Sequence, residues 1–353
     1  MRAAVISEHG GLDRVQVRQM PQAEPAADEV LLEVRSAGLN HLDIWVRKGR
    51  PGLSLAMPHV LGCDVAGVVV GMGSNVTDLK VGDEVVLNPG LSCGSCEYCN
   101  RGEQSECRQF GIVGMSRPGT FAERVAVPAG NVFPRPSHMN FDEAGAFALS
   151  YVTAWRMLMT RAQIQPGQTV LIHGIGGGVA LSALQLAKLA GAEVIVTSSS
   201  NKKLALAEQI GAPHIINYTA VADVGRQVRD VTSGRGVDVV IDTVGAATWS
   251  VGFAAVRRGG KIVLCGVTTG PKAESDLRTL YWNQLTIMGS TMGSNEDFRQ
   301  MLRAVSAARL KPVIDSVKPL EGVREAMARM ESGQQFGKIA LRISENTKTD
   351  FPK

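Results

Sequence analysis

The chain has 353 residues, of which 44% are hydrophobic and 20% charged, so it is long enough for about two domains with packed cores. Lys and Arg number 37 against 33 Asp and Glu and are scattered along the chain, which argues against a nucleic-acid partner. The start of the chain lacks the apolar run of a secretory signal, and no window approaches ~18 consecutive apolar residues. We therefore expect a cytoplasmic protein with no membrane segment and with reduced thiols.

Residues 1 to about 136 are typical of a β-rich domain. In the stretch EVLLEVRSAG at 29–38, apolar Val30, Leu32 and Val34 occupy every second position, as in a strand with one buried face. The stretches VAGVVVGMGSNV at 65–76 and VGDEVVLNPG at 81–90 have a similar character and are bounded by Gly, Asn or Asp. The pattern predicts short strands joined by turns, in a small barrel or a folded sheet.

Four of the six cysteines lie in one short loop, LSCGSCEYCNRGEQSEC at 91–107. Cys93, Cys96, Cys99 and Cys107 have the spacing C-x2-C-x2-C-x7-C, and four thiolates this close in sequence can surround one Zn²⁺. A disulfide pair or an iron–sulfur cluster is the alternative. Because a shell of four cysteines leaves no open position for water or substrate, we expect this zinc to be structural.

A different domain is predicted to begin after about residue 136. Asn140 and Glu143 have the spacing of a capping box, and DEAGAFALSYVTAWRMLM at 142–159 is typical of a mostly apolar helix. From 168 to about 291, β-branched runs alternate with amphipathic helical runs, two of which end in Gly191 and Gly211. This alternation predicts βαβ units and a parallel sheet. A helix at 295–310 and a strand at 337–343 are predicted to follow.

A glycine-rich turn follows the first strand of this region, in TVLIHGIGGGVALSALQLAK at 169–188. Ile175, Gly177 and Ala180 match a variant of the G-x-G-x-x-G fingerprint. Backbone N–H groups at a helix N-terminus carry partial positive charge, and only small residues let a pyrophosphate approach them. We expect the coenzyme to contact Gly176, Gly177, Gly178 and Val179.

The end of the second strand indicates which dinucleotide is bound. NAD sites usually place Asp or Glu there, whereas this chain has EVIVTSSSNKK at 193–203. Ser198, Ser199 and Ser200 stand near that place, with Lys202 and Lys203 just beyond. Hydroxyls and an ammonium would attract a 2′-phosphate that a carboxylate would repel. The sequence therefore predicts a preference for NADPH over NADH. An ordinary solvated helix start is the alternative reading.

The order of β-rich half, four-cysteine loop and dinucleotide fold resembles the medium-chain dehydrogenase/reductase superfamily, over nearly the whole chain. The resemblance implies an α/β protein with a GroES-like β-rich catalytic domain and a Rossmann coenzyme domain with a doubly wound parallel sheet. It places the catalytic domain at 1–150, completed by 292–353, and the coenzyme domain at 151–291. It also implies an active site in the cleft, a small-molecule substrate and a homodimer or homotetramer.

Zinc members of this family hold a catalytic metal through Cys, His and Cys. By resemblance, those positions fall at Asn40 in AGLNHLD, at Cys63 in VLGCDVAG and near Leu149. An amide, a thiol and an isobutyl group do not make a catalytic zinc site. The chain instead resembles the zinc-free quinone and enone reductase branch, which implies 2′-phosphate contacts from Lys203 and Tyr218. The same resemblance places contacts to the nicotinamide end at Thr153, Val267, Ser290 and Met292.

We therefore expect NADPH-dependent reduction of an activated C=C bond, in an enone or enoyl thioester, or of a quinone. Asn40 and Asp43 are candidates for orienting the substrate or the nicotinamide ribose, or they close a turn. One alternative is an alcohol or aldehyde dehydrogenase with a second zinc on unusual ligands, Cys63 and Asp64 with His41 or His59. Another, of a different class, is a non-catalytic NADPH-binding protein.

Overall fold

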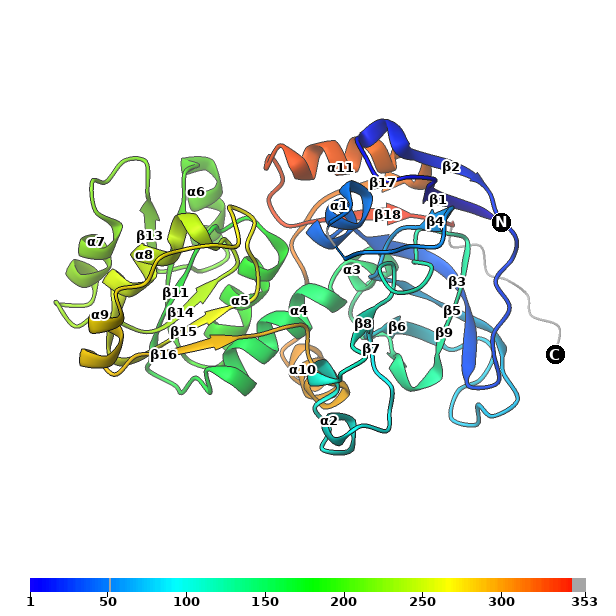
Figure 1. Cartoon of the computed structure of the whole chain (residues 1–353), viewed down its shortest axis with the longest axis horizontal. Coiled ribbons are helices and arrows are strands. Elements are labelled where there is room, and N and C mark those ends of the chain that lie inside the picture. The colour runs from blue at the N-terminus through cyan, green and yellow to red at the C-terminus, as the bar shows by residue number, and fades with distance from the viewer. Residues whose placement is uncertain (51, 345–353) are drawn as a thin grey trace. The chain divides into compact units, whose positions relative to one another are not determined.

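The structure, a computed structural model, describes residues 1–50 and 52–344. The chain forms two compact units (Figure 1). The first comprises residues 1–149 and the described residues from 293 onward, and the second is Ser150–Met292. The first unit is rich in strands, and the second alternates strands with helices. Among the described residues, no helix is long and apolar enough to cross a membrane.

The first unit is built on three sheets. Its strands are β1 Arg2–Ile6, β2 Val15–Gln19, β3 Glu29–Gly38, β4 His59–Val60, β5 Ala66–Met72, β6 Glu84–Leu87, β7 Gly90–Leu91, β8 Gly111–Ile112, β9 Arg124–Pro128, β10 Val132–Pro134, β17 Ile314–Pro319 and β18 Lys338–Arg342. The main sheet has the order β10-β6-β5-β3-β18-β17, with β9 also paired to β3, and the small sheets are β2-β1-β4 and β7-β8. Strand β3 is buried over most of its length because β5, β9 and β18 all pair with it.

The C-terminal segment completes this main sheet. Strand β18 runs antiparallel to β3, with Ala340 opposite Gly38, so residues about 300 positions apart become neighbours. Apolar residues of both segments, among them Leu32 and Leu341, share one buried core. The helices of this unit are α1 His41–Lys48, α2 Glu97–Asn100, α3 Phe141–Gly145, α10 Asn295–Ala307 and α11 Val323–Glu331, with 3-10 turns at Leu12–Arg14, Gln104–Glu106, Ala129–Asn131 and Leu320–Gly322.

The second unit is a parallel sheet with helices between its strands. Its strands are β11 Thr169–Ile172, β12 Glu193–Ser198, β13 His214–Asn217, β14 Val237–Asp242, β15 Val256–Leu264 and β16 Thr286–Gly289. Its helical segments are α4 Ala148–Trp155, which begins at the end of the first unit, a π-helix at Arg156–Arg161, α5 Gly178–Leu189, α6 Asn201–Gln209, α7 Val224–Val231, α8 Ala246–Ala255 and α9 Leu277–Trp282.

The sheet order is β13-β12-β11-β14-β15-β16, and every neighbouring pair is parallel. Strands β11 and β14 are buried along their whole length, which explains their continuous apolar runs. The order reverses between β11 and β14, and ligands of such sheets bind at this reversal, beyond the carboxyl ends of the strands. The predicted parallel sheet of βαβ units is confirmed.

The apolar run at 142–159 differs from its prediction, because it forms two helices and a π-helix rather than one helix. Helix α3 ends at Gly145, where a Cβ would lie only 2.5 Å from the backbone oxygen of Ser36. A Cβ on Gly38 would meet Ala146 just as closely, at 2.6 Å. The helix is therefore interrupted where it packs on the backbone of β3, a contact that apolar periodicity alone does not predict.

Other local signals are confirmed. The Asn140 side chain accepts from the Glu143 N–H at 2.9 Å, and the Glu143 carboxylate accepts from the Asn140 N–H at 2.8 Å. These two bonds form the predicted capping box of α3. Gly191 and Gly211 follow the ends of α5 and α6 with φ of 76° and 95°, the left-handed conformation that favours glycine after a helix.

Candidate active site and metal centre

The four-cysteine loop brings its thiols together in the first unit. The sulfur–sulfur separations are 3.9 Å for Cys93 and Cys99, 3.6 Å for Cys96 and Cys99, 3.8 Å for Cys96 and Cys107, and 3.5 Å for Cys93 and Cys107. Zinc–sulfur bonds of about 2.3 Å in a tetrahedron require sulfurs roughly 3.8 Å apart. The four thiols therefore fit a single zinc ion.

The chemistry of this loop also suits a structural zinc. Its cysteines are all free, and their sulfurs are far beyond the ~2.05 Å of a disulfide. Backbone N–H groups of Cys93 and Gln109 lie 3.3 Å from the Cys107 sulfur, where they would stabilise a thiolate. Within 1–50 and 52–344, this is the only group of three or more His, Cys, Asp or Glu side chains placed to share a metal.

The glycine-rich turn of the second unit has the geometry of a phosphate cradle. Gly174 and Gly176 have φ of 68° and 121°, which side chains other than glycine rarely adopt. Gly177 precedes the first residue of α5, Gly178, and supplies no side-chain cap, so the N–H groups of this helix end are left for a ligand. A Cβ on Gly177 would meet nothing closer than 4.0 Å, so space exists at the turn. The turn thus fits a dinucleotide pyrophosphate.

Lys203 lies against this turn. A Cβ on Gly176 would be 2.9 Å from Lys203 Cδ and 3.3 Å from its Nζ, so the lysine side chain extends over the glycines. Its backbone N–H donates to the Ser200 hydroxyl, which caps α6. The Tyr218 N–H donates to the Ser198 carbonyl at 3.1 Å, and 47% of Tyr218 is exposed. The structure therefore places the residues predicted to bind the 2′-phosphate near one another, at the carboxyl ends of β12 and β13. Exposed Ser199 lies beside them.

The residues predicted for the nicotinamide end also gather within the second unit. The Thr153 hydroxyl lies 3.8 Å from the Met292 sulfur, and Met292 has an unusual φ of 50°. Ser290 N–H donates to the Leu264 carbonyl at the end of β15, whereas its buried hydroxyl has no partner among the residues that the structure describes. Val267 follows the same strand and is 38% exposed. An unpartnered hydroxyl beside the strand ends is a group that a ligand can satisfy.

The positions of the family's catalytic zinc ligands lie in the first unit, and a buried polar cluster occupies them. Asn40 Nδ2 lies 3.3 Å from the Cys63 sulfur and 2.9 Å from Asp64 Oδ2. The Leu149 N–H donates to Asp64 Oδ1 at 2.7 Å. Burial raises the pKa of Cys63, and the nearby carboxyls of Asp43 and Asp64 raise it further.

Lys338 belongs to this cluster and was not predicted from the sequence. Its ammonium lies 2.7 Å from the Leu39 carbonyl, 2.6 Å from Asn40 Oδ1 and 3.1 Å from Asp64 Oδ2. The side chains of Lys338 and Asp64 are 5% and 0% exposed. A lysine buried to this degree requires such partners, and the only sequence signal is its place at the start of an apolar strand.

Asp43, the second predicted catalytic residue, is fixed by the backbone. Its Oδ2 accepts from the Asn40 N–H at 2.8 Å and its Oδ1 from the Gly62 N–H at 3.2 Å, at the start of α1. Burial raises the pKa of Asp43 to about 7, although both N–H groups and Lys338 act in the opposite direction. The geometry accounts for a capping role, and a catalytic role for Asp43 stays a prediction.

Among the described residues, no histidine joins the side chains of this cluster in a group placed to share a metal ion. His59 Nε2 lies 2.9 Å from the Gly114 carbonyl, and burial lowers the pKa of its ring. His41 lies on α1 and is exposed by its surface area, yet burial and the nearby Lys338 ammonium lower the pKa of its ring, so it lies close to this cluster. His173 lies in the second unit at the end of β11, where burial lowers its pKa to about 4.

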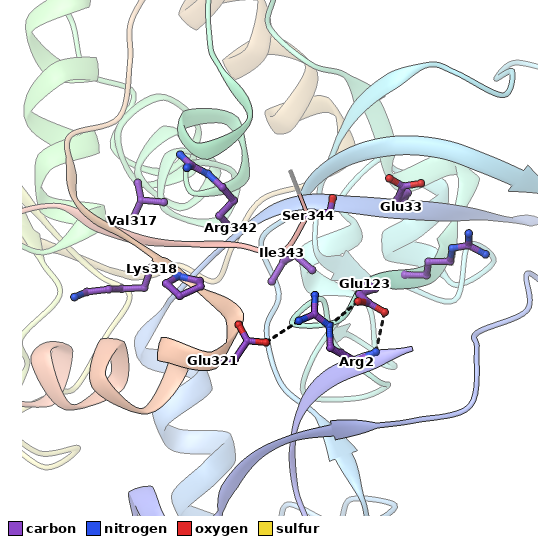
Figure 2. Close-up of a pocket in the computed structure, with 11 residues that line it drawn as sticks. Arg2, Glu33, Glu123, Val317, Lys318, Glu321, Arg342, Ile343 and Ser344 are labelled. Carbon is purple, nitrogen blue, oxygen red and sulfur yellow. Dashed lines mark hydrogen bonds and ion pairs between the residues drawn. The ribbon is translucent and has the colours of Figure 1, made fainter. Parts of the chain in front are cut away.

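A separate cavity of about 700 Å³ lies in the first unit (Figure 2). Its charged lining is largely neutralised from within, since Arg2 lies between Glu123 and Glu321 at 2.7 and 2.8 Å. Lys318 in the same lining pairs with Glu325 at 2.7 Å. None of the predicted site residues lines this cavity, so it is not the candidate active site.

Both units match known protein families. Residues 178–307 match the family described as zinc-binding dehydrogenase, and residues 26–137 match the alcohol dehydrogenase GroES-like domain. The chain is 31% identical to an NAD-dependent alcohol dehydrogenase of Sulfolobus acidocaldarius over an alignment of 354 positions. The alignment covers 98% of this chain and 100% of that protein.

Solved structures agree with these matches. The crystal structure of an NAD-dependent alcohol dehydrogenase is 41% identical, with a TM-score of 0.93 and coverage of 98% of this chain and 100% of that one. A crotonyl-CoA carboxylase/reductase is 29% identical, with a TM-score of 0.92 and coverage of 99% of this chain and 89% of that one. The predicted family is thus confirmed: the chain belongs to the medium-chain dehydrogenase/reductase superfamily and is an NAD(P)-dependent oxidoreductase of the zinc-containing alcohol dehydrogenase-like kind.

Proposed function

We propose that this chain is an NADPH-dependent reductase that delivers hydride to an activated C=C bond or a quinone, without a catalytic zinc. The observation that carries the proposal is the donor set of the first unit. Asn40, Cys63 and Leu149 offer an amide, a thiol and an isobutyl group where zinc relatives have ligands. Asp64, the carboxylate beside them, is already engaged by an ammonium. A catalytic zinc normally needs three protein ligands and one open position.

A conjugated acceptor suits a site that has no catalytic zinc. Hydride addition to the β-carbon of an enone forms a C–H bond and moves the π-electron pair onto the carbonyl oxygen as an enolate. The α-carbon then takes a proton from water, and NADP⁺ leaves. A quinone takes one hydride and one proton and leaves as the hydroquinone. In both cases the negative charge is delocalised, so neutral N–H and O–H donors can stabilise it with less help than an alkoxide requires.

Among the structural relatives, the crotonyl-CoA carboxylase/reductase supports the inclusion of enoyl thioesters in this substrate class. The test is NADPH oxidation followed by its absorbance with quinones, enones and enoyl thioesters beside simple ketones, and NADP⁺ reduction with simple alcohols. We expect turnover with the conjugated acceptors. Turnover confined to alcohols and ketones contradicts the proposal, and tight NADPH binding without turnover on any acceptor favours a non-catalytic binding protein.

An alcohol dehydrogenase is the second candidate, because several relatives carry that name. It would need a second zinc on Cys63 and Asp64 with His41 or His59. Both Asp64 oxygens already accept hydrogen bonds, and His59 Nε2 lies on a backbone carbonyl, so this ligand set would have to rearrange. Metal analysis separates the candidates, because the alcohol dehydrogenase predicts two zinc ions per chain.

We also propose that the coenzyme is NADPH rather than NADH, through a 2′-phosphate site of Ser198, Ser199, Lys203 and Tyr218. Lys203→Ala should raise KM for NADPH by about tenfold and leave KM for NADH nearly unchanged, since the ammonium pairs only with the phosphate. Lys202→Ala, at the neighbouring exposed position, is the matched control and should change neither value. Equal changes in both KM values for Lys203→Ala contradict this assignment, as does a wild-type preference for NADH.

Three further properties belong to the proposal. One structural zinc per chain is held by the four loop cysteines, and the compartment is the reducing cytoplasm, where clustered thiols remain available to a metal. The chain assembles as a homodimer or homotetramer through the edge of the second unit's sheet. Strand β16 is the last strand of that sheet, and neighbouring Leu277, Tyr281 and Trp282 of α9 are 69%, 67% and 66% exposed. An apolar edge of this kind favours pairing with a second copy.

A further inference from the structure

Lys338 uses all of its hydrogen-bonding capacity inside the protein. An ammonium has three N–H groups and no acceptor. Its Nζ lies within hydrogen-bond distance of three oxygens, on Leu39, Asn40 and Asp64. With all three N–H groups used in this way, Lys338 has none left for a substrate oxygen. Any effect of Lys338 on the reaction must pass through a neighbour.

The neighbour is Asn40, whose amide orientation follows from this contact. Because an ammonium only donates, the amide atom 2.6 Å from Lys338 must be the oxygen, and the amide nitrogen faces the other way. One N–H of that nitrogen donates to Asp64 Oδ2 at 2.9 Å. The second has only the Cys63 sulfur and the Gly38 carbonyl, both at 3.3 Å. Asn40 is 7% exposed, and a substrate oxygen would have to compete only with these two long contacts for its second N–H.

We propose that Lys338 is the positioning residue that orients and polarises the Asn40 amide, so that its second N–H binds the oxygen on which negative charge develops. This inference rests on the proposed function. A cation on the amide oxygen withdraws electron density from the nitrogen, which strengthens its N–H as a donor. Asn40 donates a hydrogen bond and transfers no proton. The electrons come from the NADPH hydride and the proton from water.

Asp64 makes this arrangement possible. It accepts from the Leu149 N–H and from Asn40, and it pairs with Lys338, so it holds the amide from the opposite side. The charges of Asp64 and Lys338 cancel, which avoids an unpaired charge in a buried site. The amide is thus fixed before substrate arrives, and a preorganised donor is worth more in catalysis than one that must reorient.

The kinetic test is a double-mutant cycle, with an activated acceptor as substrate. Asn40→Ala should lower kcat by about a hundredfold, as the loss of an oxyanion donor does. Lys338→Met should lower kcat by about tenfold with KM for NADPH unchanged, because the N–H remains but is weaker and less well placed. In the Asn40→Ala background, Lys338→Met should cause no further loss. Equal losses in both backgrounds overturn the inference.

Two controls guard against a folding effect. Lys318→Met, at a lysine of the surface cavity, should leave kcat unchanged. The charge-balanced variant Lys338→Met with Asp64→Asn avoids a lone buried carboxylate and should melt near the wild type, yet its kcat should still be reduced by about tenfold or more. Wild-type kcat in this stable double variant contradicts the inference.

A binding test separates this inference from the proposed function. The probe is 4-nitrophenolate, a delocalised oxyanion, with neutral 4-nitroanisole as its control, and binding is followed by absorbance. Lys338→Met should weaken phenolate binding by about tenfold and leave anisole binding unchanged. If the wild type reduces no conjugated acceptor but shows this result, the proposed function fails and the oxyanion site stands. If the wild type is active but Lys338→Met leaves phenolate binding unchanged, the inference fails and the proposed function stands.

Discussion

At the scale of single residues, the sequence indicates chemistry best where the partners are close in the chain. The four cysteines lie within one loop, so their spacing predicts the cluster that the structure contains. Lys338 lies 274 positions from Asp64, and in the sequence it cannot be distinguished from an exposed lysine at the start of a strand. Long-range pairs of this kind depend on which strands become neighbours, and that is fixed only by the complete fold.

The raised pKa of Asp43 predicts a pH-dependent stability. Burial raises this pKa from 3.8 to about 7, so the folded chain holds a proton that the unfolded chain releases. The resulting stabilisation is fully present below about pH 4 and is lost as the pH rises to about 7. Urea unfolding is measured at intervals between these pH values. As the pH rises, the free energy of unfolding of the wild type should fall relative to that of Asp43→Asn.

The comparison depends on the shape of the two curves, because the Asp43→Asn variant also loses one of the two N–H contacts and is less stable at every pH. Asp230→Asn, at an exposed position of α7, is the control and should follow the wild type throughout. Parallel curves for the wild type and Asp43→Asn between pH 4 and 7 contradict the raised pKa.

At the scale of elements, periodicity and capping signals predict most of what the structure contains. The parallel strands, the glycines after α5 and α6 and the capping box at Asn140 all follow from local sequence. The interruption after Gly145 does not, because it results from close packing on the backbone of β3. A tertiary contact therefore overrides the helical tendency of the run, as packing commonly does.

The metal loop is an element whose shape depends on its ligand. Cys99→Ser should abolish zinc binding and lower the melting temperature, because a zinc site of four cysteines contributes its binding energy to folding. Cys265→Ser, at a cysteine just after β15 that belongs to no cluster among the described residues, should retain zinc. Zinc content by mass spectrometry and thermal melting check both variants, and a Cys99→Ser protein with full zinc occupancy contradicts the assignment.

At the scale of the whole molecule, the sequence predicts two fold types from the change in pattern after about residue 136. The pairing of the C-terminal strand β18 with β3 is not encoded in any local pattern, and it was expected only through the family resemblance. The same strand carries Lys338 to Asn40 and Asp64, so the long-range topology of the first unit builds the candidate site.

Assembly is the prediction that concerns the molecule as a whole. Replacing Trp282 with lysine should convert the oligomer to a monomer, because a charge on this apolar edge opposes pairing with a second copy. Val231→Lys is the matched control, since Val231 is also an exposed apolar residue, on α7, and should leave the oligomer intact. Light scattering coupled to gel filtration measures both masses. A monomeric wild type, or an oligomer unaffected by Trp282→Lys, contradicts the proposed edge.

The most direct test of the central claim is the zinc content of catalytically active protein, measured together with turnover of an activated acceptor. An amide, a buried thiol and a lysine-paired carboxylate in place of ligands predict one zinc per chain, held by the four-cysteine loop. The activity should depend on NADPH and the acceptor and not on a second metal ion. Two zinc ions per chain, with the second removed by a chelator in step with loss of activity, would contradict the account.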